Sequence, residues 1–276
     1  TLLDFHVQDR WVTVDNGRID WAMGQVVLSG TYDLQSTAIQ AVVFPNGVDL
    51  AEAVRQAGGV EHAWTTFTGE GEVNVAGTLS PVNVQGTMDI ALADFWVGNG
   101  PIRAPSTERL LTMPRGQVKG QIGITADGIR LHGKQTVVGA TSGDVNAYIG
   151  FDWFGPLDIK VDVDRTNLAT FRPLKDLNLL GVGGVRGTIS GPFQDIRISG
   201  AGQFANFEVL GIPFADEVRT TVECNDRTLL RFGSIDARKG QTHYRGDVTA
   251  TIADDVEMGV DLFISEGRIA DLLNIV

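Results

Sequence analysis

The run VRGTISGPFQDIRISGAGQFANFEVLGIPF, from Val185 to Phe214, decides the fold. Hydrophobic residues or glycines alternate with polar residues on both sides of Gly191-Pro192. A period of two is typical of a β-strand with one apolar face, and a glycine-proline step interrupts such a strand. We therefore expect consecutive antiparallel strands in this run.

The same alternation occurs along most of the chain. In the last stripe, Val256 to Ile264, apolar residues occupy every second position and Asp255, Glu257 and Asp261 stand between them. This pattern predicts a sheet with one apolar face and one acidic, solvated face. Asn16-Gly17 and Asp127-Gly128 lie between alternating runs, where such dipeptides favour tight hairpin turns. The fold class predicted is mainly β and antiparallel.

A short motif recurs along the chain. Asn167-Leu168-Ala169 predicts a helical turn capped by Asn167, and a Gly-Thr-Ile-Ser strand follows it. Asp49-Leu50-Ala51 is likewise followed by Gly-Thr-Leu-Ser, and Arg268 to Leu273 predicts a third helical turn. We expect one continuous repeat segment with approximate units 1–57, 58–175 and 176–276. The chain has no initiator methionine and no apolar run of the roughly 18 residues that a membrane span needs, so we expect a piece of a longer protein.

Composition and motifs argue against several functions. The net charge of −12 argues against nucleic acid and against anionic lipid headgroups as direct partners of the surface. The histidines His6, His62, His132 and His243 have no partners at metal-ligand spacing. Asp162, Asp164 and Asn167 resemble a calcium loop but lack its glycine and its terminal glutamate. No catalytic motif is found, so we predict a non-enzyme without cofactor or metal.

The Gly-Thr-Ile-Ser-Gly-Pro run, the Ile-Arg-Ile-Ser-Gly run and the segment Phe207 to Phe214 together resemble the repeat of the AsmA-like superfamily, and most of all of TamB-type proteins of diderm bacteria. The resemblance implies a β-sheet curled into an elongated open trough, a β-groove, with short capping helices. It implies a periplasmic segment of an inner-membrane-anchored protein. It further implies a phospholipid conduit between inner and outer membranes that serves outer-membrane biogenesis.

If the trough is open, apolar residues of the alternating strands line it and contact acyl chains. These residues are Met88, Ile90, Leu92, Ile159, Val161, Val163, Ile196, Ile198, Val260 and Leu262. Alternation alone does not separate this trough from a closed β-sandwich, whose core the same residues would fill.

Two other functions therefore stay open. One is an adhesin or carbohydrate-binding module, which the five tryptophans and the acidic surface would suit. The other follows from the resemblance: a factor that assembles outer-membrane β-barrel proteins, with a barrel partner of the Omp85 type.

Overall fold

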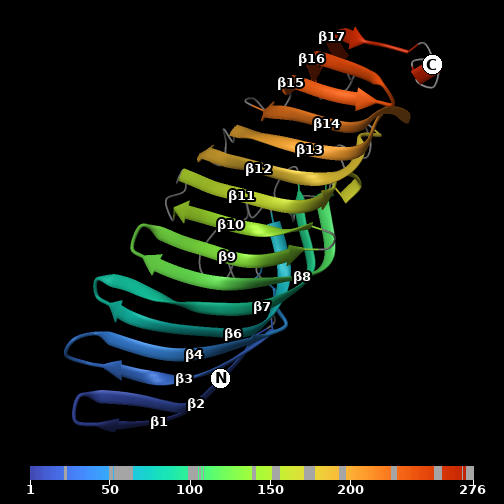
Figure 1. Cartoon of the computed structure of the whole chain (residues 1–276). Helices are drawn as coiled ribbons and strands as arrows, with labels where there is room; N and C mark the ends of the chain where they lie inside the picture. The colour runs from blue at the N-terminus through green and yellow to red at the C-terminus, as the bar shows by residue number, and fades with distance from the viewer. Residues whose placement is uncertain are drawn as a thin grey trace. The chain divides into compact units, whose positions relative to one another are not determined.

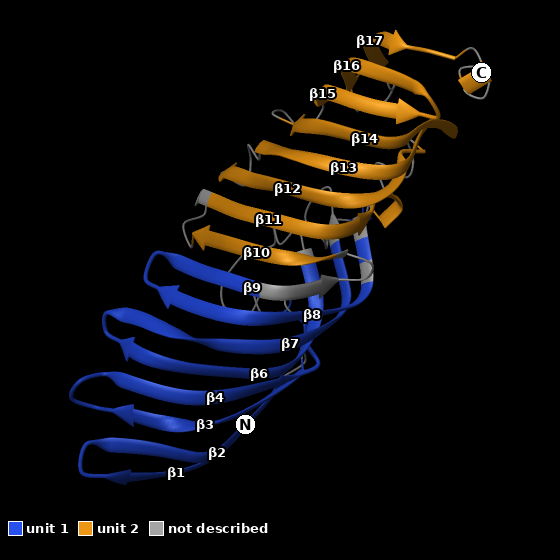
Figure 2. Cartoon of the chain, viewed as in Figure 1, with its two compact units in different colours: residues 1–139 blue, residues 140–276 orange. Residues whose placement is uncertain are grey.

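The computed structural model describes residues 1–21, 24–49, 52, 65–98, 105, 107, 109–138, 141–150, 156–170, 178–192, 197–224, 229–251, 257–268 and 270–271. These residues are almost entirely antiparallel β-strand, which confirms the predicted fold class. The chain divides into two compact units, Thr1–Gly139 and Ala140–Val276 (Figure 2). This division differs from the three repeat units predicted, but compactness does not define a repeat, so the repeat boundaries stay a prediction.

Unit 1 is a meander in which successive strands lie side by side (Figure 1). The short β5 continues the line of β4, because both pair with β6. No pairing between described residues joins β1 to β9, so this sheet does not close on itself. The strands are β1 (Leu2–Gln8), β2 (Trp11–Trp21), β3 (Gly24–Asp33), β4 (Ala38–Asn46), β5 (Val48–Asp49), β6 (Thr65–Leu79), β7 (Val82–Gly98), β8 (Arg109–Thr125) and β9 (Gly128–Val138).

Unit 2 is built in the same way and is also open in its described part, where each strand pairs with the next. The only regular interruption described is a 3-10 turn, η1 (Leu168–Thr170). The strands are β10 (Thr141–Gly150), β11 (Pro156–Asn167), β12 (Leu180–Pro192), β13 (Arg197–Val209), β14 (Ile212–Cys224), β15 (Leu229–Lys239), β16 (Thr242–Thr251) and β17 (Glu257–Glu266).

The short capping helices that we expected are not seen in the described residues. The turn η1 stands at the second predicted position, and beyond it only Glu52, Ala270 and Asp271 have helical conformation. The predicted cap itself is present, because Asn167 Oδ1 accepts a hydrogen bond of 3.0 Å from the Ala169 backbone N–H. Leu50 lies outside the described residues. A helix long and apolar enough to cross a membrane is not found in the part of the chain that is described.

The expected hairpin turn at Asn16-Gly17 is wrong. Strand β2 runs straight through this dipeptide, and the chain turns earlier, between Gln8 and Trp11. The pairing of β2 with β3 shifts by a residue between Val14 and Gly17, so Asp15 and Asn16 form a bulge, and Gly17 pairs regularly with Leu28. The expected turn at Asp127-Gly128 is confirmed by the hairpin of β8 and β9.

Glycines permit neighbouring strands to approach closely on the apolar side. A Cβ at Gly86 of β7 would collide with the backbone oxygen of Asn74 on β6. Gly246 of β16 has φ +151°, and a Cβ there would collide with the backbone oxygen of Asp261 on β17. The strands of each unit bend along their length (Figure 1). Glycines at such positions allow a strand to bend, as expected for an open, curled sheet.

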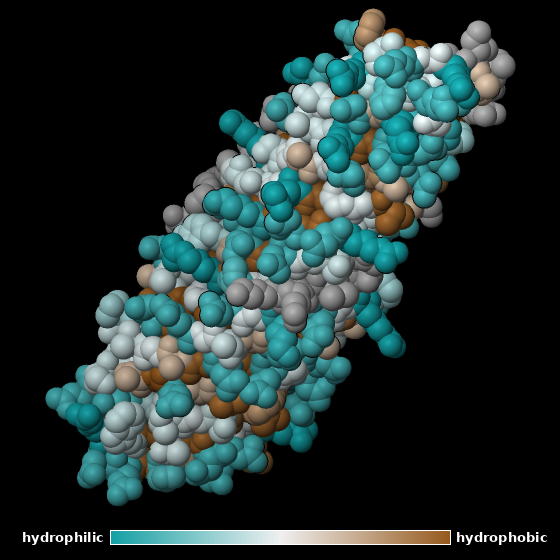
Figure 3. Space-filling model, in the orientation of Figure 1, coloured by the Kyte–Doolittle hydropathy of each residue, from teal (hydrophilic) through white to brown (hydrophobic). Residues whose placement is uncertain are grey.

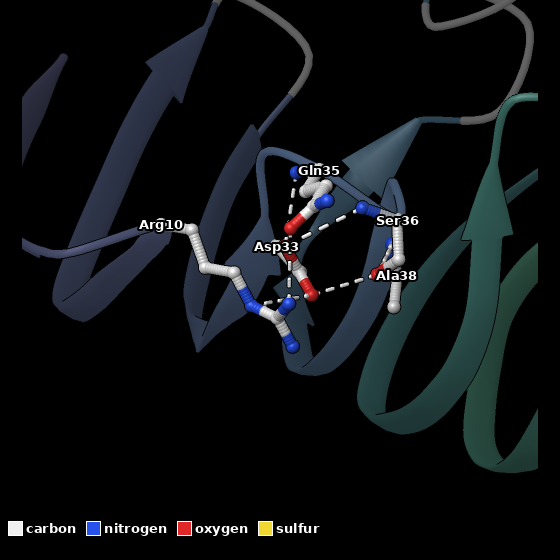
Figure 4. A network of polar contacts seen from close by, with 5 residues as sticks. All are labelled: Arg10, Asp33, Gln35, Ser36 and Ala38. Carbon is white, nitrogen blue, oxygen red and sulfur yellow. Dashed lines mark hydrogen bonds and ion pairs between the residues drawn. The ribbon is translucent and has the colours of Figure 1, made fainter.

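A buried carboxylate ties two hairpin ends of unit 1 together (Figure 4). Asp33 is 1% exposed and accepts hydrogen bonds from the Gln35 N–H at 2.9 Å and the Ser36 hydroxyl at 2.8 Å. Arg10, from the turn between β1 and β2, places its Nε 3.3 Å from the Asp33 carboxylate. The turn between β3 and β4 is therefore fixed to the neighbouring hairpin by this ion pair and by a hydrogen bond of 3.1 Å that Arg10 donates to Gln35 Oε1.

Candidate functional site

Unit 2 contains a hydrophobic cavity of about 300 Å³, called here the unit 2 groove. Every described lining residue except Thr220 is apolar. They come from strands β13 to β17, from Leu210 in the turn between β13 and β14, and from Leu179 just before β12. The lining consists of Leu179, Phe207, Val209, Leu210, Ile212, Phe214, Val218, Thr220, Phe232, Ile235, Val248, Ala250, Met258, Val260 and Leu262.

Aromatic rings pack beneath the groove and hold its shape. The rings of Phe204 and Phe207 stack with centroids 6.2 Å apart, and Phe214 lies edge-on to Phe207 at 6.4 Å. Phe214 in turn stacks on Tyr244 at 5.2 Å. Leu168 of η1 belongs to the same buried cluster. The 3-10 turn therefore contributes a hydrophobic side chain to the buried cluster.

Two bulges bring residues of opposite sequence parity onto the groove side. Phe204 and Phe207 are three residues apart yet pack together, because Asn206 between them adopts φ +52° and the pairing with β12 shifts there. Phe232 and Ile235 both line the groove, because Ser234 adopts φ +50° and the pairing with β16 shifts between them. Each bulge adds a residue to one strand and re-aims the side chains beyond it.

The groove has a buried floor and exposed walls. Leu179, Phe207 and Val218 on the floor are 4%, 7% and 2% exposed. On the walls, Leu210 is 54% exposed and Val260 is 59% exposed. Water therefore reaches large apolar side chains of the same cavity, which a closed hydrophobic core would not permit. An elongated apolar ligand could lie on the floor with one end in solvent.

The predicted lining residues occupy several places. Only Val260 and Leu262 line the unit 2 groove. In unit 1, Met88 and Leu92 are buried and Ile90 is half-buried on β7. In unit 2, Ile198 is 40% exposed. The three residues on β11 (Ile159, Val161 and Val163) are half-buried, and Ile196 lies outside the described residues.

The sequence prediction missed most of the groove. Phe207, Phe232 and Ile235 were not predicted to line it, because a strict period of two breaks at each bulge. Two signals were present in the sequence. Three phenylalanines lie between positions 204 and 214, and Asn206 belongs to a residue type that tolerates positive φ.

Charged side chains on the opposite face pair across neighbouring strands. Arg186 approaches Asp162 at 2.7 Å, and Arg231 approaches Asp247 at 3.7 Å. On the face visible in Figure 3, hydrophilic residues cover most of the surface and hydrophobic ones emerge in patches between them. Burial raises the pKa of Tyr244, whose hydroxyl has no hydrogen-bond partner among the described residues. The negative charges of Asp271 and Asp216 raise this pKa further.

A second hollow, of about 790 Å³, lies over β11 to β15 and has a mixed lining of charged, polar and apolar residues. Asp162, Arg186 and Arg219 are among its lining residues, and it contains no tryptophan or tyrosine from the described chain. Phe204 also lines this hollow but is 4% exposed, so little of its ring is open for a ligand to stack on. Within the described residues, no cluster of three or more His, Cys, Asp or Glu side chains could hold a metal ion.

No protein-family model, no curated protein and no solved structure matches the chain.

Proposed function

We propose that the chain is a lipid-binding segment of a conduit, in which acyl chains of phospholipid lie along a hydrophobic β-groove. The observation that carries this proposal is the unit 2 groove, with its apolar lining, buried floor and exposed walls. Its volume of about 300 Å³ is at the lower end of the range for small-molecule sites, so one acyl chain segment would fill it.

The energetics of such a groove suit movement of the cargo. Each methylene that leaves water gains about 0.8 kcal/mol. This gain has no direction, so a chain loses little when it slides between equivalent apolar positions. Thr220 is the one polar side chain in the lining, so few hydrogen bonds would fix the cargo in place. The exposed walls leave room for a polar headgroup in water.

The resemblance to TamB-type proteins supports the cellular setting of the proposal. A curled, open trough in the periplasm would carry phospholipid between the inner and outer membranes for outer-membrane biogenesis. The open, antiparallel sheets and the interstrand glycines are compatible with this trough. The carbohydrate-binding alternative would need an exposed aromatic ring, and Phe204, the aromatic residue that lines the second hollow, is 4% exposed.

The test is lipid co-purification measured by native mass spectrometry, with a matched pair of variants on β17. Val260 lines the groove and is 59% exposed, whereas Phe263 on the opposite face of the strand is 69% exposed. We expect Val260→Asp to remain folded, because its carboxylate reaches water, and to lose most bound lipid. Phe263→Asp should keep its lipid. Wild-type protein without any bound lipid, or equal loss in both variants, would contradict the proposal.

A further inference from the structure

The hairpin turn between β13 and β14 is apolar throughout. Its sequence from Val209 to Phe214, called here the β13–β14 tip, is VLGIPF, and no charged residue lies between Glu208 and Asp216. The next hairpin turn at the same end of the sheet, between β15 and β16, reads KGQT from Lys239 to Thr242 and is polar. Exposed turns usually carry polar residues, so a run of apolar residues at such a turn indicates a function.

Leu210 occupies this turn at a conformational cost. Val209 pairs with Ile212, so Leu210 and Gly211 form a two-residue hairpin loop. Their φ angles are +54° and +79°, and positive φ at both loop residues belongs to the turn in which Asn-Gly is preferred. A leucine is strained there, because its Cβ approaches the following carbonyl oxygen. Such strain at an exposed position indicates that the apolar side chain itself is needed.

The β13–β14 tip leads into the unit 2 groove. Leu210 and Ile212 both line the groove and are 54% and 39% exposed. Phe214, two residues further along β14, also lines it and is half-buried. Val218 on the floor is 2% exposed. The apolar surface therefore continues from solvent at the tip to the buried floor along one strand.

Charge indicates which apolar surroundings the tip can enter. The tip has no basic residue, and the net charge of the chain is −12, so a bilayer of anionic lipid would repel it. Asp216, the first carboxylate beyond the tip on β14, lies 3.3 Å from the Lys239 ammonium, which neutralises it. The tip can thus contact the hydrocarbon of a zwitterionic bilayer while this carboxylate keeps its partner.

We propose that the β13–β14 tip is the entrance of the unit 2 groove, where it contacts a bilayer of zwitterionic lipid and an acyl chain passes over Leu210 into the groove. This inference rests on the proposed function and gives it a partner, the bilayer itself. Contact with the bilayer spares the acyl chain a passage through water, where every exposed methylene costs free energy. A polar side chain at position 210 would interrupt this apolar path.

The test follows uptake of a probe lipid by the whole 276-residue chain. The probe is phosphatidylcholine with one pyrene-labelled acyl chain, concentrated in phosphatidylcholine vesicles so that its excimer fluorescence falls as lipid leaves. Uptake by contact has a rate that rises in proportion to protein concentration, whereas uptake through water is limited by desorption of the lipid. We expect the proportional rise, and slower uptake from vesicles that contain phosphatidylglycerol.

Substitutions at two equally exposed leucines locate the entrance. Leu210→Asn should slow uptake by about fivefold or more, while its melting temperature should not fall, because Asn-Gly suits this turn. Leu210→Gly removes the same side chain without a new polar group and should also slow uptake. Leu34→Asn is the matched control, because Leu34 is 55% exposed in the turn between β3 and β4 and lies outside the groove lining. It should take up lipid at the wild-type rate.

The outcomes separate this inference from the proposed function. Wild type that never takes up the probe would overturn both. Wild type that takes up the probe at a rate independent of protein concentration would overturn only the contact with a bilayer. Wild-type rates in both Leu210 variants, or equal slowing by Leu34→Asn, would place the entrance elsewhere. Faster uptake from the anionic vesicles would contradict the choice of zwitterionic lipid.

Discussion

At the scale of single residues, the clearest departure from a simple one-sided sheet is the buried carboxylate of Asp33. Burial alone would raise its pKa, but hydrogen bonds from Gln35 and Ser36 and the positive charge of Arg10 outweigh that effect and hold the pKa below its ordinary value. The sequence alone does not identify Asp33 as a buried, ion-paired carboxylate, because it is one of many acidic residues that flank turns. Its environment depends on Arg10 from the preceding hairpin, a contact that no local pattern specifies.

The lowered pKa of Asp33 gives a pH-dependent prediction. A group whose folded pKa is depressed stabilises the protein above its unfolded pKa of about 3.9 and loses that contribution as the pH falls through the folded value. Asp33→Asn should therefore lower the melting temperature at pH 7, and the difference from wild type should shrink in strong acid. Thermal melts across this range measure it. Asp158→Asn removes an exposed carboxylate 3.9 Å from Lys160 and should change little; an equal effect would contradict the special role of Asp33.

At the scale of elements, alternation predicts the strands well and their interruptions poorly. In β17 the predicted parity holds from Met258 to Ile264, where the pairing with β16 runs without a shift. Val256 and Asp255 lie outside the described residues. The bulges at Asn206 and Ser234 escaped prediction, because a bulge is selected by the fit of two strands that are distant in the sequence. Asn16-Gly17 shows the converse: the dipeptide favours a local turn, yet the strand continues through it, with a bulge at Asp15 and Asn16.

The close strand approach at Gly86 gives a prediction at this scale. Gly86→Ala should destabilise the protein by about 1–3 kcal/mol, because the new methyl group meets the backbone oxygen of Asn74 and the two strands must separate. Gly123 on the neighbouring β8 is the matched control, since the nearest atom to an added Cβ there is 3.9 Å away. Gly123→Ala should be close to neutral. Chemical denaturation measures both variants, and equal destabilisation would contradict the steric cause, because an alanine that merely restricts the unfolded chain stabilises a protein.

At the scale of the whole molecule, the decisive question for function is whether the apolar face is covered. The sequence fixes which residues share a face only within each strand, and it leaves the closure of the sheet undecided. In the structure neither unit closes on itself in its described residues, and large apolar side chains of the groove remain exposed. The buried cluster around Phe204, Val218 and Tyr244 shows that part of the same face does form an ordinary core. The protein thus combines a packed base with an open apolar wall.

This combination predicts opposite outcomes for one charge placed at two depths of unit 2. Ile198 on β13 is 40% exposed, so the carboxylate of Ile198→Asp can reach water, and the melting temperature should fall only slightly. Val218 on β14 is 2% exposed, so Val218→Asp buries an unpaired charge at a cost of several kcal/mol, on the order of the whole stability of a domain, and should unfold the unit. If acyl chains also pass over this part of the apolar face, which lies outside the unit 2 groove, Ile198→Asp should carry less lipid while it stays folded. Circular dichroism and native mass spectrometry on the same samples separate the two effects. An Ile198→Asp protein that unfolds as readily as Val218→Asp would mean that the wall is closed, and the face a conventional core.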